Sequence, residues 1–320
     1  MKPLLGICAA LLVLACLPAR AQDAWPQKPV RLIIPYAAGG NSDDIMRPVV
    51  QKLGPALGQT VIIENRAGGG TVIGTDIVAK APPDGYTLLY VPAPFVANPS
   101  MMRKLPYDSL RDFAPITQVM RSPLVLIVTP QLPVQTVSRL IAYARANPGK
   151  LSFGSGIGGA GHLAGELMKS VAGIDMVHIG YKGSAPAMLD LVAGRLQLIF
   201  SPPSEAIPQM RGGKVRALAV TTPKRSSLLP DLPTVDESGL KGFDVSVWGG
   251  LAAPAGTPRA IINKLQSRVA EVLKEPDIRE HFKAIGAEPV GSTPEEFDRF
   301  LREQIPFWAR IIKQANIHID

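Results

Sequence analysis

Residues 35–44 read PYAAGGNSDD, and they separate a strand-like run, VRLII at 30–34, from a helical pattern that begins near Asp43. A strand that ends in a glycine-containing turn and then opens a helix leaves several backbone N–H groups without intrahelical acceptors, aimed at one point. Gly39 and Gly40 permit positive φ and close approach of a ligand, and the Asn-Ser-Asp that follows consists of helix-capping types. The stretch therefore predicts either a well-capped turn alone or one half of an anion-binding loop.

The first third of the chain alternates short strand-like runs with helical patterns. Strands are expected at 30–35, 61–64 and 86–91, and helices at 44–57 and 75–81. This alternation is typical of a parallel sheet with right-handed crossovers. A second glycine turn, GGGT at 68–71, follows the second strand. Because parallel neighbours end at the same edge of a sheet, we expect the two turns to lie together.

A second alternating unit follows proline-rich irregular sequence and the apolar run PLVLIV at 123–128. The expected elements are strands at 151–153, 176–179, 196–200, 215–220 and 245–253, helices at 136–146, 161–172 and 184–193, and two further helices that open at Thr257 and Thr293. The sequence thus predicts an α/β protein of two lobes, joined by a two-strand hinge crossed near Arg121 and Val245. Lobe one would comprise residues 22–121 and 245–320, and lobe two residues 122–244. A cleft between the lobes is where a ligand is expected.

The first 21 residues have the pattern of a signal peptide: a lysine at position 2, an apolar run at 4–17 and an Ala-Arg-Ala cleavage site at 19–21. We expect cleavage after Ala21 and export to the periplasm. Lipid attachment at Cys16 is an alternative that fits its sequence less well. Because Cys8 and Cys16 are the only cysteines, the mature chain would have neither a disulfide nor a cysteine metal site.

The net charge of +8 is spread over the chain, and Lys2 and Arg20 of the leader contribute two of these charges. Without a lysine- and arginine-rich block, the charge argues against nucleic acid as a partner and is compatible with small anionic ligands. Just under 300 mature residues exceed what one core usually organises, which also favours two lobes.

The second glycine-rich stretch is FGSGIGGAGH at 153–162. It matches the G-x-G-x-x-G spacing of dinucleotide sites, but the acidic residue expected about 20 positions later is missing from 179–182, and an exported protein would rarely meet NAD. The turn still offers N–H donors at a helix start, and Ser155 adds a hydroxyl. We therefore expect a second anion cradle here. A third junction, GYKGSAP at 180–186, contains Lys182, which could face a carboxylate or simply be solvated, and Tyr181, which could wall a pocket or simply pack.

Residue types for catalysis are few. The four histidines have no metal-binding spacing, and the sequence contains no P-loop. Ser155 with His162 offers a remote alternative as an exported serine hydrolase, although no G-x-S-x-G elbow or orienting acid accompanies the pair. We predict a protein without enzymatic activity, cofactor or metal.

Four segments in order resemble one family: WPQKPVRLIIPYAAGGNSDD, LGQTVIIENRAGGGTVIGTDIVAKAPPDGYTLL, SGIGGAGHLAGELMKSVAGIDMVHIGYKGSAPAMLDLVAGRLQLIF, and the segment from RALAVTTPKR to LAAPAGTP. They are similar to the Bug family, the extracytoplasmic solute receptors of tripartite tricarboxylate transporters, over essentially the whole mature chain. The resemblance implies a periplasmic binding protein of the type II class. Such a receptor closes on a carboxylate and delivers it to a membrane permease.

The resemblance also implies where the ligand lies, in the loop at 36–43, with Asp43 closing that loop, and in the lobe-two loop at 154–158. The predicted ligand-binding residues are Tyr36, Ala38, Gly39, Gly40, Asn41, Ser42, Asp43, Ser155, Gly156, Ile157, Gly158, His162, Tyr181 and Ser201. Asn41 and Ser42 stand where Pro-Thr is common in the family, which implies a differently shaped loop. Ser201 stands where many members have Asp, which weakens the case for an amino-acid ligand. We expect a monomer, with a signalling partner in place of a permease as the alternative.

Overall fold

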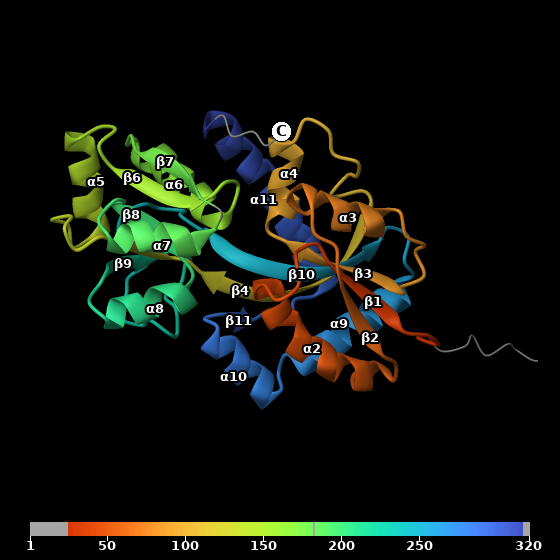
Figure 1. Cartoon of the computed structure of the whole chain (residues 1–320). Helices are drawn as coiled ribbons and strands as arrows, with labels where there is room; N and C mark the ends of the chain where they lie inside the picture. The colour runs from red at the N-terminus through yellow and green to blue at the C-terminus, as the bar shows by residue number, and fades with distance from the viewer. Residues whose placement is uncertain (1–24, 182, 316–320) are drawn as a thin grey trace, which may run out of the picture.

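The computed structural model describes residues 25–181 and 183–315. The predicted signal peptide, Cys16 and Lys182 lie outside the described residues. The described part is an α/β protein of two lobes, each built on its own β-sheet with helices packed against it (Figure 1). Within this part of the chain, no helix is long and apolar enough to span a membrane.

Lobe one contains the beginning and the end of the described chain. Its elements are β1 (Val30–Ile34), α2 (Asn41–Leu57), β2 (Val61–Asn65), the 3-10 turn η1 (Gly69–Thr71), α3 (Val72–Ala79), β3 (Thr87–Pro92), α4 (Pro94–Met101), β4 (Phe113–Pro123), β10 (Ser246–Pro254), α9 (Arg259–Val272), α10 (Pro276–Ala284), β11 (Glu288–Pro289) and α11 (Pro294–Ala315). The sheet order is β11-β4-β10-β3-β1-β2. Strands β1, β2 and β3 are parallel, so the turns after β1 and β2 do lie at one edge.

Lobe two contains the middle of the chain. Its elements are β5 (Val125–Val128), α5 (Val137–Ala146), β6 (Ser152–Gly156), α6 (Ala160–Ala172), β7 (Val177–Tyr181), α7 (Ser184–Val192), β8 (Leu198–Ser201), α8 (Pro203–Arg211) and β9 (Arg216–Val220). The sheet order is β7-β6-β8-β5-β9. The pairs β6–β7 and β6–β8 are parallel, whereas β5 runs antiparallel to both of its neighbours.

Two adjacent strands carry the chain between the lobes. Strand β4 pairs antiparallel with β10 along its length, from Phe113 opposite Pro254 to Pro123 opposite Ser246. Strand β5 of lobe two begins two residues after β4 ends. Arg121 joins the two strands near the crossing, because its Nε donates to the Ser246 hydroxyl at 3.0 Å and its guanidinium pairs with Asp244. Figure 1 shows both strands running through the middle of the molecule.

Three helices that the sequence did not predict, α4, α8 and α10, each have a proline in the first turn. Proline reads as a helix breaker along the sequence, but its missing N–H costs nothing at a helix start. Helix α4 also contains Pro99, which leaves the carbonyl of Phe95 without its helical donor. The Ser109 hydroxyl donates to that carbonyl at 3.1 Å. The expectation of irregular sequence after Pro92 was therefore wrong for residues 94–101.

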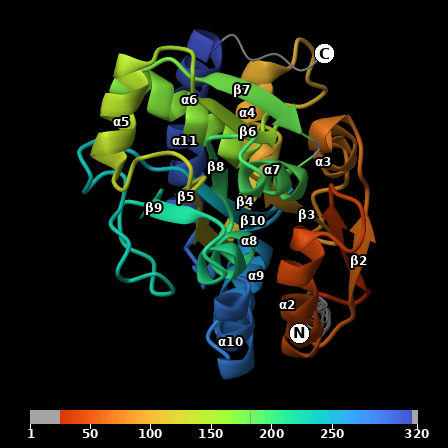
Figure 2. The same cartoon turned by 60° about the vertical axis from the view of Figure 1, so that its left-hand side comes forward.

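The C-terminal helix α11 packs against α4 and β4 and reaches α6 of lobe two. Figures 1 and 2 both place it between α4 and lobe two. Phe300 of α11 meets Trp248 of β10 edge to face, with ring centroids 5.0 Å apart. The Ser170 hydroxyl of α6 donates to Gln314 of α11 at 3.1 Å. Helix α11 thus braces the crossing strands from one side and touches both lobes.

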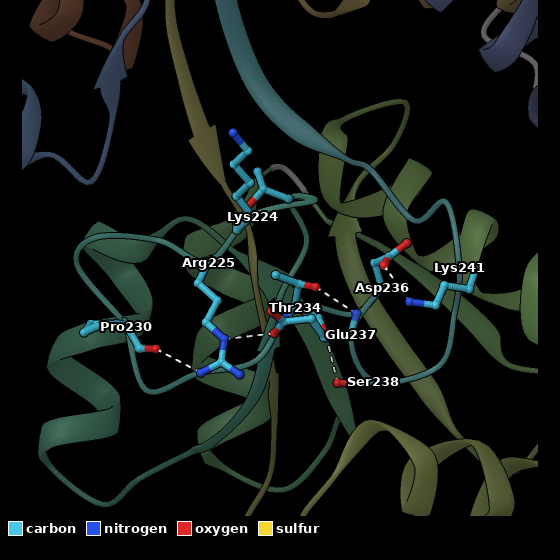
Figure 3. A network of polar contacts seen from close by, with 9 residues as sticks. Lys224, Arg225, Pro230, Thr234, Asp236, Glu237, Ser238 and Lys241 are labelled. Carbon is cyan, nitrogen blue, oxygen red and sulfur yellow. Dashed lines mark hydrogen bonds and ion pairs between the residues drawn. The ribbon is translucent and has the colours of Figure 1, made fainter.

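The return path from lobe two, residues 221–245, forms neither helix nor strand and is held by side-chain bonds (Figure 3). Thr234 and Glu237 form a reciprocal turn, in which each side chain accepts the other's backbone N–H at 2.9 Å. Arg225 donates to the same Glu237 at 2.9 Å and to the Pro230 carbonyl at 3.2 Å. Polar bonds thus fix a segment that has no ladder of its own.

We expect Gly250→Ala to destabilise the fold, although alanine usually stabilises an extended position relative to glycine. A Cβ at 250 would lie 2.3 Å from the Phe297 ring of α11 and 2.8 Å from the Thr117 carbonyl oxygen. Overpacking of this kind costs about 1–3 kcal/mol of unfolding free energy. Gly212→Ala is the matched control, since the nearest atom to its Cβ is 3.5 Å away. Urea unfolding midpoints that fall equally for both variants would contradict this.

Candidate functional site

A cavity of about 450 Å³ lies between the lobes, at the ends of β1 and β3 and beside the crossing strand β10. It is lined by residues of the β1–α2 loop, of β3 and the start of α4, of the start of α6, and of β10: Tyr36, Ala37, Gly40, Asn41, Ser42, Tyr90, Pro92, Ala93, Pro94, Gly159, Ala160, Val247 and Trp248. The predicted loop at 36–43 therefore contributes lining residues, whereas lobe two contributes Gly159 and Ala160, which follow the predicted loop at 154–158.

The β1–α2 loop is held by the carboxylate of Asp43. Asp43 is 2 % exposed and accepts the backbone N–H of Gly39, which has the positive φ of +80° that glycine allows. Asn65, the last residue of β2, donates to Asp43 Oδ1 and to the Tyr36 carbonyl, both at 3.2 Å. Arg47 lies one turn along α2 and donates to Oδ2 at 3.2 Å. The loop is thus closed by a buried carboxylate that bonds to three partners.

Burial alone would raise the pKa of Asp43, but the bonds from Gly39, Asn65 and Arg47 bring the pKa below its usual value. Hydrogen bonds to the charged form favour ionisation, so this side chain is an anion at neutral pH. An anion already occupies the inner side of the loop and accepts the Gly39 N–H. The N–H groups at the helix start, farther along the loop, are the ones left for a ligand.

Helix α2 begins earlier than the sequence predicted, at Asn41 instead of near Asp43 or Asp44. Gly40 is the N-cap, and no side chain caps this helix end. Asp43, one of the capping types that follow the glycines, turns back to accept the Gly39 N–H instead of capping the helix. Without a side-chain cap, the first N–H groups of α2 remain available at the cavity.

Three helices begin at this one cavity. Gly40 and Asn41 open α2, Ala93 and Pro94 open α4, and Gly159 and Ala160 open α6. Each helix start carries the positive end of a helix dipole, and the starts of α2 and α6 add N–H groups without intrahelical acceptors, whereas Pro94 at the start of α4 has no N–H. Among the described residues that line the cavity, none is Lys, Arg, His, Asp or Glu. The arrangement can therefore attract an anion with backbone dipoles, without a charged side chain on the wall.

Two phenols add to the wall on the lobe-one side. Burial raises the pKa of both Tyr36 and Tyr90, so both hydroxyls are neutral at pH 7. Tyr90 lies against β10, where a Cβ at position 249 would be 2.0 Å from its hydroxyl, so only glycine fits there. Tyr90 did not stand out in the sequence because it reads as an ordinary residue of an apolar strand.

The predicted lobe-two residues Ser155 and His162 are buried, and both form hydrogen bonds within their own lobe. The Ser155 hydroxyl lies 2.8 Å from Nε2 of His178, and Nδ1 of His162 accepts the Gly158 N–H at 3.1 Å. Ile157, between them, is 60 % exposed. None of these three residues, nor Gly156 or Gly158, is among the lining residues. The hydrolase alternative paired Ser155 with His162, whereas the structure pairs Ser155 with His178.

Tyr181 and Ser201 have partners away from the cavity. The Tyr181 hydroxyl donates to Asp190 of α7 at 2.6 Å. Ser201 is fully buried, and its hydroxyl donates to Glu205 of α8 at 3.2 Å. Ala38 and Gly39 shape the β1–α2 loop without lining the cavity. Residues 92–94 at the edge of lobe one line the cavity, whereas residues 202–205 of lobe two do not.

The predicted ligand-binding residues did not include the following lining residues: Ala37, Tyr90, Pro92, Ala93, Pro94, Gly159, Ala160, Val247 and Trp248. The predicted start of α6 could have pointed to Gly159 and Ala160. Backbone N–H groups that can bind an anion are those at the start of a helix, and not those of the glycine loop before it. Val247 and Trp248 carried no such signal. They line the cavity only because β10 crosses between the lobes. No cluster of three potential metal ligands occurs among the described residues.

The sequence and the fold have close relatives. A family model described as tripartite tricarboxylate transporter family receptor matches residues 45–317. BugT of Bordetella pertussis is 37 % identical over 92 % of this chain and 91 % of its own. The structure of Rhodopseudomonas palustris Rpa4515 with adipate has 37 % identity and a TM-score of 0.77, covering 92 % of this chain and 99 % of that one. MatC of the same species, with bound malate, has 30 % identity and a TM-score of 0.74, covering 90 % and 100 %.

These matches extend over almost the whole described chain, and the structures share its two-lobe fold. The resemblance to the Bug family is confirmed by the relatives themselves, because two of them, BugT and the periplasmic binding protein BugD, carry that name. The chain belongs to the tripartite tricarboxylate transporter receptor family, whose members are solute receptors and not enzymes.

Proposed function

We propose that this chain is a periplasmic receptor that binds a small organic carboxylate in the cleft between its lobes and delivers it to the permease of a tripartite tricarboxylate transporter. The observation that carries the proposal is the meeting of three helix starts at one cavity whose described wall has no charged side chain. The relatives solved with adipate and with malate support the ligand class.

In this proposal the first turn of α2, at Asn41 and Ser42, and the first turn of α6, from Ala160 onward, hold a carboxylate from opposite lobes. The Gly159 N–H already donates to the Gly156 carbonyl at 3.1 Å. Carboxylate oxygens accept bonds from backbone N–H groups as readily as from side chains, and fixed dipoles need no reorganisation when the ligand arrives. Tyr36 and Tyr90 offer hydroxyls. Asp43, Gly39 and Ala38 give the loop its shape without contacting the ligand.

We infer that the lobes, at 22–121 with 245–320 and at 122–244, close about the two crossing strands. Ligand held by α2 on one side and α6 on the other would tie the lobes together. Closure would create a surface that only the ligand-bound protein has, and a permease or a signalling partner could recognise that surface. The chain is taken to act as a monomer after removal of residues 1–21.

The far wall of the cavity indicates which carboxylates fit best. Pro92 and Pro94 of lobe one and Val247 and Trp248 of β10 present apolar surface and no charged group. A ligand body made of CH₂ groups loses little on leaving water for such a wall, whereas each buried hydroxyl without a partner costs about 1–3 kcal/mol. We therefore propose a preference for carboxylates with a hydrocarbon body over polyhydroxylated acids.

We expect adipate to raise the melting temperature of the ligand-free mature protein more than galactarate, which has the same six-carbon dicarboxylate chain with four hydroxyls. A ligand at 100 times its Kd stabilises the native state by about 2.7 kcal/mol. Differential scanning fluorimetry across mono-, di- and tricarboxylates measures both the function and the preference. A panel without any shift contradicts the function, and a larger shift with galactarate contradicts the preference alone.

We expect Asp43→Asn to weaken carboxylate binding by about tenfold or more, because the amide cannot replace the anion that accepts the Gly39 N–H and pairs with Arg47. Hydrogen bonds to charged groups contribute about 1.5–3 kcal/mol. Asp44→Asn removes the same charge from the same helix turn at an exposed position and is the matched control. Isothermal titration of both variants decides, and equal affinities would show that Asp43 does not shape the loop for binding.

A further inference from the structure

We propose that His162 is a positioning residue: it holds the loop before α6 in its binding shape by accepting the Gly158 N–H, and it can do so only while it is neutral. The proposal rests on the proposed function, because that loop leads into the first turn of α6 at the cavity. It makes carboxylate affinity depend on the protonation of a residue that does not itself line the site.

The bond between loop and helix fixes the tautomer of His162. Gly158 N lies 3.1 Å from Nδ1, and a backbone N–H can only donate, so Nδ1 must be unprotonated and the ring proton must be on Nε2. Gly158 has a φ of +73°, so the chain turns sharply there. The next two residues, Gly159 and Ala160, line the cavity. The Gly158 bond therefore sets the direction in which the first N–H groups of α6 point.

Helix α6 lies close enough to the lobe-two sheet for this bond because two of its residues are glycine. A Cβ at position 161 would lie 2.9 Å from the Phe200 carbonyl oxygen, and one at 165 would lie 2.1 Å from the Phe153 ring. The close approach buries His162 to 6 % exposure and seats its ring on that of His178, which belongs to the edge strand β7. The two ring centroids are 3.7 Å apart, with planes 13° from parallel.

The two imidazoles secure the loop at two points. His178 lies within 2.8 Å of the Ser155 hydroxyl near the start of the loop, and His162 holds Gly158 near its end. The exposed Ile157 lies between these two points, over Gly180 of β7. The stacked pair thus links α6 and β7 to the only part of lobe two that lines the cavity among the described residues.

The surroundings of the pair oppose a positive charge. Burial lowers the pKa of His162 to about 4, with His178 and then Lys169 adding to the effect. Burial also lowers the pKa of His178, a hydrogen bond with the Ser155 backbone opposes this, and Lys169 lowers it further. The charged groups near the pair on α6 are Lys169 and Glu166, which are bonded to each other at 3.0 Å. From β7, the imidazole of His178 is a second titratable group that faces His162.

Carboxylate affinity should fall as the pH falls. The pKa of His162 is lower in the folded loop than the usual value of about 6.5, so protonation favours the opened loop. The contribution of the pair to loop stability is complete above about pH 6.5 and is lost as the pH falls toward 4. Carboxylate affinity should fall over the same range, because an opened loop no longer points the α6 N–H groups into the cavity.

The test compares His162→Asn with His162→Leu. Asparagine places an acceptor oxygen near the position of Nδ1 but does not titrate, whereas leucine is of similar bulk and has no acceptor. At pH 7.5 the Asn variant should bind the most stabilising carboxylate of the panel about fivefold more tightly than the Leu variant, as expected for one hydrogen bond. On lowering the pH to 5, wild-type affinity should fall relative to the Asn variant. Titration of the ligand is common to all variants and cancels in these ratios.

His281→Asn is the control for the pH profile, since His281 lies on α10 in lobe one and its Nε2 contacts the Asp44 carbonyl. It should keep the pH dependence of the wild type. Nitrogen NMR of the His162 ring reads the tautomer directly in ligand-free protein, where Nδ1 should be unprotonated at pH 7.5.

Equal affinities of the Asn and Leu variants, a pH profile unchanged by His162→Asn, or a proton on Nδ1 would each overturn the proposal while carboxylate binding stands. If the wild type binds no carboxylate at any pH, the proposed function fails, and the binding role of His162 fails with it. Should the Leu variant not fold, the comparison of the Asn variant with the wild type across pH still decides.

Discussion

The buried carboxylate of Asp43 is the interaction on which the lobe-one half of the site depends. It accepts the Gly39 N–H inside the loop and is itself held by Asn65 at the end of the neighbouring parallel strand. Because β1 and β2 are parallel, their ends meet at one edge, and this lets Asn65 reach a loop 29 residues earlier through the Tyr36 carbonyl. An anion built into the loop in this way leaves the N–H groups at the start of α2 directed at the cavity.

The cleft as a whole likewise presents backbone dipoles to a ligand in place of charged side chains. Helices α2, α4 and α6 start there, and the described wall contains phenols, small residues and apolar side chains but no acid, lysine, arginine or histidine. Behind this wall lie the charged carboxylate of Asp43 in lobe one and two imidazoles in lobe two, whose lowered pKa values keep them neutral. In the function proposed here, these carboxylate and imidazole groups orient the backbone N–H groups of α2 and α6, and those N–H groups contact the ligand.

Much of the fold could be predicted because its strands and glycine turns obey local rules. The last helix begins after Thr293 as expected, with a capping box between Thr293 and Glu296, and Thr136 caps α5. Helices α4, α8 and α10 were missed because their first-turn prolines look like breakers, and α2 started early because Asp43 serves the loop and not the helix end. Strand β4 was missed because its pairing with β10 spans more than a hundred residues of sequence.

Local sequence patterns identify only part of the wall of this cavity. Tyr36, Gly40, Asn41 and Ser42 line the cavity, but Tyr90 and Trp248 are placed there by strand register across the sheet, which no local pattern encodes. The most direct measurement is a crystal structure of the protein with the carboxylate that stabilises it most. We expect carboxylate oxygens within about 3.2 Å of backbone nitrogens in the first turns of both α2 and α6. A carboxylate held by lysine or arginine side chains, or bound outside this cavity, would contradict it.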